Sequence, residues 1–479
     1  MPGILDRERI IAPAGFNRWL VPPAALAIHL SIGMAYGFSV FWLPLSHAIG
    51  ITDPAPDDWK ISTLGWMFTL FFVFLGSSAA LFGHWLERAG PRKAGVVAAC
   101  CWGGGFFVSA LGVYVHQIWL LWLGSGVIGG CGLGLGYISP VSTLIKWFPD
   151  KRGMATGMAI MGFGGGAMIG SPLADILMKH FATPHSVGVW ETFVTLGAIY
   201  FVAMMCGAFG YRLPAEHWRP AGFNSPASAE QRGMITSRHV HVHGVFRIPQ
   251  FWLLFVVLWM NVSAGIGVIG MASPMLQEVF GGTLIHLPAA LKDLGTNERA
   301  QVATMGAGFA ALLSLFNIAG RIFWASLSDY IGRKTTYYVF FVLGFVLYCL
   351  VPFAGRTGSV PLFVGLFCMI LTMYGGGFAT IPAYIADLFG TRYVGAIHGR
   401  ILLAWSAAGI LGPVLVNYLR EYQVKHGVPV GQAYNTTMYV LAGLLVIGLI
   451  ANALVKPIAP ERFMSEAQLV SERRPAEAR

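Results

Sequence analysis

Charged residues are scarce in this chain of 479 residues. Asp, Glu, Lys and Arg make up 11% of it and hydrophobic residues 56%, whereas soluble proteins carry about 25% charged residues. Such a chain cannot cover a folded surface with polar groups, so we expect the lipid bilayer to be its solvent. The net charge of +10 is spread too thinly to form a basic nucleic-acid-binding patch, and no nucleic acid partner is expected.

Cysteine and catalytic motifs are also lacking. The six cysteines all fall in apolar stretches without the paired spacing of a disulfide framework or metal site, so we expect small buried residues. His239, His241 and His243 have no Cys or carboxylate at ligand spacing and indicate a polar linker. No Ser-His-Asp set, phosphate-cradling loop or metal-binding helix appears, so we expect no enzyme, cofactor or metal site.

Long apolar runs are what the chain has in abundance. A hydrocarbon core about 30 Å thick takes roughly 20 helical residues to cross, and twelve runs qualify. The sequence therefore predicts an all-α integral membrane protein with twelve transmembrane helices. The spans lie near residues 19–48, 61–83, 94–115, 117–147, 153–181, 190–211, 250–280, 301–325, 335–353, 360–387, 396–420 and 434–455.

The basic residues indicate how these spans are oriented. If the N-terminus is cytoplasmic, the tails and every second loop hold 23 of the 31 Lys and Arg residues, the opposite loops hold 7, and Arg321 lies within a span. Cytoplasmic loops of membrane proteins carry this excess of positive charge. We therefore predict a multi-pass protein of the cell membrane, the inner membrane if bacterial, with both termini cytoplasmic. We expect a monomer.

One long polar connection divides the chain into two six-helix halves. It carries Pro, Ser, charges and the three histidines, and it falls between spans six and seven. Two six-helix halves in parallel repeat are the architecture of a rocking secondary transporter. The predicted segments are a cytoplasmic N-terminal tail (1–18), an N-terminal bundle (19–212), a cytoplasmic linker (213–249), a C-terminal bundle (250–456) and a cytoplasmic C-terminal tail (457–479).

The two halves repeat a short motif at an offset of 242 positions. An acidic residue followed three residues later by Gly and then basic residues occurs at Glu87 and again at Asp329. The motif resembles the loop signature of the major facilitator superfamily. Gly permits a tight turn, while a neighbouring helix N-terminus and an Arg would hold the carboxylate and so stabilise one conformation. The alternative is a solvated basic turn. The candidate conformational lock comprises Glu87, Arg88, Arg92, Asp329 and Arg333.

Arg321 lies deep in the eighth span. It precedes Asp329 by eight positions, which places it about 12 Å into a core whose half-thickness is about 15 Å. A cation at that depth marks a ligand or ion pathway by default. No acidic residue shares the depth, so we expect an anionic substrate there, with Asn317 one turn earlier sharing the site. The alternative is an arginine that caps carbonyls or snorkels.

Two further side chains leave alternatives open. Arg400 lies five residues after Gly395, roughly 7.5 Å into its span, and is a cytoplasmic gate, a second anion contact or a snorkelling residue. His29, early in the first span, is either a proton acceptor or a hydrogen-bonded helix residue.

From about Phe16 to Lys456 the chain resembles the oxalate/formate antiporter family, a branch of the major facilitator superfamily related to monocarboxylate transporters. The fragments that carry the resemblance are Trp147–Gly153, Arg247–Trp252, and Gly320-Arg321 with the downstream Ser328-Asp329 and Gly332-Arg333. The resemblance implies that Arg321 pairs with the substrate carboxylate. It also implies an aromatic enclosure made of Tyr36, Tyr137, Tyr374 and Phe378.

Trp405 marks a departure from that family. The oxalate carriers place a lysine at this position of span eleven, so one certain mid-membrane cation remains, which suits one carboxylate better than two. The sequence thus predicts a secondary active transporter that exchanges small organic anions, preferably monocarboxylates such as formate, lactate or pyruvate, by alternating access. The alternatives are a proton-coupled symporter, a dicarboxylate antiporter using Arg321 with Arg400, and a membrane sensor on a transporter scaffold.

Overall fold

The computed structural model describes residues 3–51, 55–215, 218–220, 234–465 and 467–468. Twelve helical segments of this part are long and apolar enough to cross a membrane, and no β-strand occurs in it, which confirms the predicted fold class. The α-helices are α1 (Val21–Ile32), α2 (Trp42–Leu45), α3 (Ile61–Ala89), α4 (Pro91–Tyr114), α5 (Ile118–Leu121), α6 (Gly130–Trp147), α7 (Arg152–Phe181), α8 (Val189–Gly210), α9 (Pro249–Phe280), α10 (Thr296–Ile331), α11 (Arg333–Arg356), α12 (Val360–Phe389), α13 (Val394–Ile401), α14 (Leu403–Lys425) and α15 (Asn435–Leu454).

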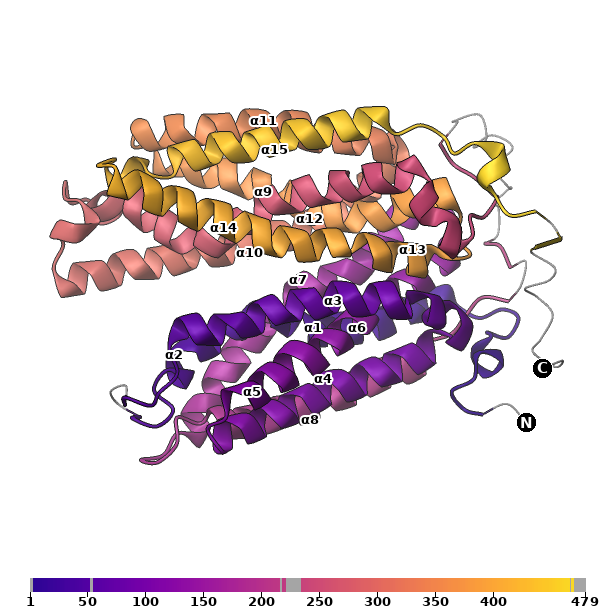
Figure 1. Cartoon of the computed structure of the whole chain (residues 1–479), viewed down its shortest axis with the longest axis horizontal. Helices are drawn as coiled ribbons and strands as arrows, with labels where there is room; N and C mark the ends of the chain where they lie inside the picture. The colour runs from indigo at the N-terminus through magenta and orange to yellow at the C-terminus, as the bar shows by residue number, and fades with distance from the viewer. Residues whose placement is uncertain (1–2, 52–54, 216–217, 221–233, 466, 469–479) are drawn as a thin grey trace.

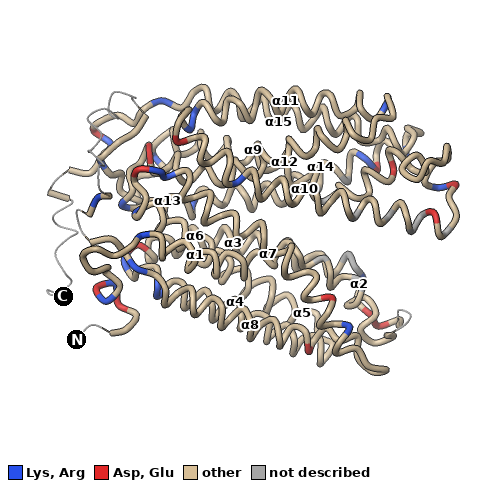
Figure 2. The backbone as a smooth tube through the Cα atoms, turned by 180° about the vertical axis from the view of Figure 1, so that it is seen from behind, with Lys and Arg blue, Asp and Glu red and all other residues tan. Residues whose placement is uncertain are grey.

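The helices form two bundles, α1–α8 and α9–α15 (Figure 1). The first and the last described residues of the chain lie at one end of the molecule (Figure 1). We name this the terminal end and the opposite end the distal end. The ribbons of the two bundles approach each other at the terminal end and diverge toward the distal end (Figure 1). Lys and Arg gather at the terminal end (Figure 2).

Two expected spans are interrupted where they approach the other helices. After α1, the first span continues as a tight 3-10 stretch, Gly33–Phe41, and a Cβ atom at Gly33 would overlap the Phe163 carbonyl of α7. The eleventh span is divided at Leu402 into α13 and α14. Because α13 packs against α3 of the other bundle, this short helix belongs to the boundary between the bundles.

Glycines allow the helices of the N-terminal bundle to pack closely. In the fourth span, Cβ atoms at Gly126, Gly130 and Gly134 would each clash with α3. Such small-residue stripes let transmembrane backbones approach one another. Glycine serves a different purpose at Gly90 and Gly332, which are 242 positions apart and share a φ of +88°, a region that other residues rarely adopt. The tight turns predicted from the repeated motif are thereby confirmed.

The cysteines correct one expectation. Only Cys368 is buried, Cys100 and Cys206 are exposed, and Cys101, Cys131 and Cys349 are intermediate. In a membrane protein an apolar helix face can point outward to lipid, so an apolar neighbourhood in the sequence does not imply burial within the protein.

The described part of the linker lies along the terminal end of the C-terminal bundle. The backbone amides of Thr236 and Val240 donate to the carbonyls of Asp387 and Phe389. The rings of His241 and His243 pack against His84, with centroids 6.5 and 5.3 Å away. Residues 216–217 and 221–233 of the predicted linker lie outside the described residues, as do 1–2, 466 and 469–479 of the tails.

Candidate functional site

Arg321 is fully buried on α10, with an exposed fraction of 0%. Its Nε donates to Asn317 Oδ1 and its Nη1 to the Ile160 carbonyl of α7, both at 3.2 Å. Nη2 has no hydrogen-bond partner, and the ion pairs of the described residues do not include Arg321. A guanidinium offers five donors, so this group presents an unmatched positive edge at the boundary between the bundles.

Aromatic rings from both bundles surround the guanidinium. The Arg321 Cζ atom lies 5.6 Å from the Phe378 ring centroid and 6.0 Å from that of Phe163. The Trp405 ring lies 4.5 Å from Phe378, 5.4 Å from Phe163 and 5.4 Å from Tyr137. Tyr36 lies 6.2 Å from Trp405. This enclosure stabilises a cation through the ring faces while excluding water.

Several hydrogen-bond donors in the enclosure lack an acceptor. The hydroxyl groups of Tyr36, Tyr137 and Tyr374 and the Trp405 Nε1 are buried without a hydrogen bond of good geometry. The three tyrosines lie within electrostatic range of Arg321. Each unmatched buried group costs about 1–3 kcal/mol. A set of donors around a cation is chemically suited to an anion with several acceptor oxygens.

The structure thus brings together seven of the eight residues named as binding candidates from sequence. They are Arg321, Asn317, Tyr36, Tyr137, Tyr374, Phe378 and Trp405. Arg400 is elsewhere, because its Nη1 donates to the Ala396 carbonyl and its Cζ lies 5.8 Å from the Phe246 ring. Phe163 was missed, although it lies 242 positions before Trp405 and the repeat offset would have pointed to it.

His29 lies beside this site, fully buried on α1. Its Nδ1 faces the Ala159 carbonyl, and its Nε2 faces the Tyr137 carbonyl at 3.1 Å. A neutral imidazole has a single N–H and can donate to only one of these oxygens, whereas an imidazolium donates to both. The contacts fit a proton acceptor, and they also fit a hydrogen-bonded helix residue.

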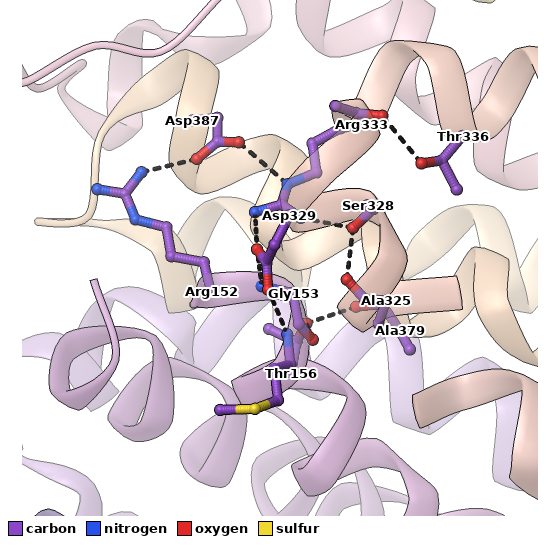
Figure 3. Close-up of polar contacts among 12 residues, drawn as sticks. Arg152, Gly153, Thr156, Ala325, Ser328, Asp329, Arg333, Thr336, Ala379 and Asp387 are labelled. Carbon is purple, nitrogen blue, oxygen red and sulfur yellow. Dashed lines mark hydrogen bonds and ion pairs between the residues drawn. The ribbon is translucent and has the colours of Figure 1, made fainter. Parts of the chain in front are cut away.

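A network of hydrogen bonds at the terminal end joins the bundles around Asp329 (Figure 3). The Asp329 carboxylate accepts from the backbone amides of Gly153 and Met154 at 2.8 and 2.9 Å. These amides open α7, whose positive N-terminal dipole favours a carboxylate. Arg333 pairs with Asp329 at 2.6 Å and with Asp387 at 3.1 Å.

Glu87 makes the equivalent contact in the other half. It accepts from the Gly395 amide at the start of α13 at 2.9 Å and from Ser142 Oγ at 3.0 Å. The cation beside it is Lys146, at 2.5 Å, which corrects the expected pairing with an arginine. Arg88 is exposed. Arg92 donates to the carbonyls of Ile4, Phe209 and Tyr211 and so stabilises its own bundle.

Asp387 and Arg152 belong to the same network but were not anticipated. Arg152 of α7 pairs with Asp387 of α12 at 2.7 Å across the bundle boundary. Arg152 lies within the fragment Trp147–Gly153, but nothing in the local sequence indicates that it pairs with Asp387. The inter-bundle hydrogen bonds of Asp329, Asp387 and Glu87 lie at the terminal end, so this end is closed in this conformation. One further bond joins the bundles beside Trp405, where Ser406 Oγ of α14 donates to the Phe72 carbonyl of α3 at 2.6 Å.

Comparisons with known proteins agree with the fold. A family profile described as the Major Facilitator Superfamily matches residues 12–413 and 282–474. The oxalate:formate antiporter of Oxalobacter formigenes is 26% identical over 397 residues, covering 83% of this chain and 83% of that protein. Human monocarboxylate transporter 11 is 25% identical over 422 residues, covering 85% and 78%.

Among solved structures, the E. coli fucose:proton symporter FucP has a similar fold, with a TM-score of 0.63 at 12% identity, covering 91% of this chain and 99% of that one. The resemblance inferred from sequence is therefore confirmed at the level of the family. Since the family profile spans most of the chain and the twelve helices have the matching arrangement, the chain belongs to the Major Facilitator Superfamily and is a multi-pass membrane transporter, not an enzyme.

Proposed function

We propose that this transporter carries a small organic anion, preferably a monocarboxylate, across the membrane by alternating access. The observation that carries the proposal is the unmatched Nη2 of buried Arg321, enclosed by donors from both bundles that also lack acceptors. The excess of Lys and Arg at the terminal end (Figure 2) supports a cytoplasmic location for that end and for both termini. This conformation would then be open toward the outside.

The charge of the site favours one carboxylate over two. Arg321 is the one cation among the described residues that contacts the enclosure, since Trp405 stands where a lysine would have added a second. A dicarboxylate would require Arg400, whose contacts with Ala396 and Phe246 lie elsewhere. One relative is named for oxalate and formate and another for monocarboxylates, and these names support a small carboxylate as the substrate.

Exchange of one anion for another follows from the cost of an unpaired charge. Occluding Arg321 without an anion leaves a buried cation uncompensated at a cost of several kcal/mol. A bound carboxylate removes this cost, so a loaded carrier reorients faster than an empty one. The competing candidate is proton symport through His29, favoured by the two carbonyl oxygens that face its ring.

Uptake into proteoliposomes tests the proposal. Labelled formate, lactate, pyruvate and oxalate are offered to purified wild type, Arg321→Lys and Arg321→Gln, with the exposed Arg247→Gln as a matched control. Arg321→Lys should impair uptake because it loses bidentate geometry, and Arg321→Gln should nearly abolish it. Uptake by Arg321→Gln equal to that of the control would exclude the site, and wild type that transports nothing would favour a sensor.

Preloading separates exchange from symport. Vesicles loaded with unlabelled substrate should take up label faster than vesicles loaded with buffer. Equal rates, together with uptake that is driven by a pH gradient and lost in His29→Gln, would replace exchange with proton symport.

A further inference from the structure

The 242-position repeat relates individual contacts at the terminal end, not just helices. A Cβ atom at Gly157 of α7 would crowd the Arg321 carbonyl of α10. At Gly399 of α13 it would overlap the Ala79 carbonyl of α3. Gly157 and Gly399 are 242 positions apart, and so are Ala79 and Arg321. Because equivalent contacts occur in both halves, a contact that is present in one half and missing in the other points to a residue with a different role.

The repeat fails at His398. The equivalent residue in the first half is Thr156, whose Oγ1 donates to the Ala379 carbonyl across the bundle boundary at 2.6 Å. The equivalent of Ala379 is Tyr137, so the repeat assigns the Tyr137 carbonyl to His398. That carbonyl instead faces the Nε2 of His29 at 3.1 Å.

His398 is consequently left without hydrogen bonds in this conformation. Its exposed fraction is 0%, and neither Nδ1 nor Nε2 has a partner. Unmatched buried groups of this kind cost about 1–3 kcal/mol each, and a small or apolar residue would avoid the cost. Because His398 bears this cost while the terminal end is closed, we expect its side chain to bind a partner when that end is open.

The location of His398 places it between the Arg321 site and the terminal end. It lies seven residues before Trp405 in the same span, roughly 10 Å nearer that end. Its ring is 5.9 Å from that of Tyr137, which lies within electrostatic range of Arg321. Opening the terminal end must part α13 from α3, so an anion that leaves Arg321 in this direction passes His398.

We propose that His398 is a second binding station for the transported carboxylate, used when the terminal end is open. The inference rests on the proposed function. The imidazole N–H groups donate to the carboxylate after it leaves Arg321 and before it reaches water. In the conformation with the terminal end closed, the ring lies against Tyr137 without a hydrogen-bond partner.

The charged groups around α13 leave His398 available for this role. Its titratable neighbours are His29 and Tyr137. On α3, Glu87 is bound to Lys146 and His84 packs against the linker residues His241 and His243. On α12, Asp387 is bound to Arg152 and Arg333, and Tyr384 stacks on Tyr337. On α13 itself, Arg400 lies over Phe246. The carboxylates named here already have cationic partners, so a transported anion has no competitor among them for the imidazole.

The proposal predicts a pH dependence confined to one side of the membrane. Histidine ordinarily titrates near pH 6.5, and the imidazolium binds a carboxylate more tightly than the neutral ring does. Affinity measured from the terminal side should therefore rise as the pH on that side falls through about 6.5. Affinity measured from the distal side, where Arg321 is reached first, should not change through His398.

Sided vesicles from cells that produce the full chain provide the test. Inside-out vesicles present the terminal end and right-side-out vesicles the distal end, and the KM for a labelled monocarboxylate is measured at about pH 6 and about pH 8. The variants are His398→Thr, which installs the residue of the other half, and His398→Gln, which keeps an amide N–H donor group but cannot be protonated. The exposed His180→Thr near the distal end of α7 is the control.

We expect His398→Thr to raise the terminal-side KM about tenfold at pH 6, which corresponds to one lost charge-assisted hydrogen bond. Both His398 variants should lose the pH dependence on that side and keep the wild-type distal KM, while His180→Thr behaves as wild type. Wild-type pH dependence in both variants would overturn the role of His398 alone. A wild type that moves no carboxylate from either side would overturn the proposed function, and the role of His398 with it.

Discussion

Replacing Asp329 by Asn should open the terminal end. The carboxylate holds two α7 amides of the opposite bundle at 2.8 and 2.9 Å and pairs with Arg333. Hydrogen bonds to charged groups contribute about 1.5–3 kcal/mol each. Asn retains one neutral acceptor. We therefore estimate that the free energy favouring the closed terminal end falls by about 2–3 kcal/mol, which shifts the ratio of the two populations roughly 30- to 150-fold toward the terminal-open state.

Glu87→Gln should have a smaller effect for a reason visible in the structure. Glu87 holds one backbone amide of the opposite bundle, that of Gly395, whereas its other partners, Ser142 and Lys146, belong to its own bundle. We expect a loss of about 1.5 kcal/mol, close to a tenfold shift. The two members of the repeated motif are therefore unequal.

Distance measurements between spin labels on the terminal ends of α3 and α13 would report the populations of the two states. Asp175→Asn is the matched control, because Asp175 lies on α7 in an exposed pair with Lys179. The order of opening should be Asp329→Asn, then Glu87→Gln, with Asp175→Asn equal to wild type. If Glu87→Gln opens the terminal end more than Asp329→Asn does, or if neither variant changes the distances, the assignment of the lock is refuted.

Three further outcomes are expected. Gly399→Ala should favour the terminal-open state in the same distance measurement, because its Cβ would overlap the Ala79 carbonyl. An unchanged distance distribution would show that the contact between α13 and α3 tolerates the added methyl group. In Asp150, burial raises the carboxyl pKa but hydrogen bonds and charge from Arg18 outweigh it and hold the pKa below its ordinary value. The pair therefore stabilises the fold above about pH 4 and loses this contribution as the pH falls through the lowered pKa of the folded state, so Asp150→Asn should lower Tm at pH 7 and lower it progressively less in acid. Trp405→Lys should improve competition by oxalate relative to monocarboxylates in uptake assays, and an unchanged order of substrates would contradict the valence argument.

The sequence was sufficient to predict features that depend on hydrophobicity and on the repeat. Apolar run length predicted the twelve helices, and the 242-position offset identified Gly90 and Gly332, which share the same positive φ. Arg321 stood out because a mid-membrane cation is rare for energetic reasons. Apolar run length, the repeat offset and the depth of a charge within a span can all be read along one chain, so a single sequence contains them.

Several contacts between distant segments could not be predicted, apart from the aromatic enclosure that the family resemblance implied. Lys146 replaces the expected arginine beside Glu87 because helix geometry brings α6 against α3. Asp387 pairs with Arg152 across 235 positions, and no local pattern connects them. His398 becomes notable only when the carbonyl that the repeat assigns to it is found to face His29.

Equilibrium binding to purified protein tests the central claim most directly, since it needs neither orientation nor coupling. The affinity of labelled formate, lactate and pyruvate is measured for wild type, Arg321→Gln and Arg247→Gln. Wild type and Arg247→Gln should bind at least one of these anions equally well. Arg321→Gln should bind it about 150-fold more weakly, as expected for about 3 kcal/mol lost with a buried cation. Equal affinity in wild type and Arg321→Gln would contradict the claim that Arg321 holds the transported carboxylate.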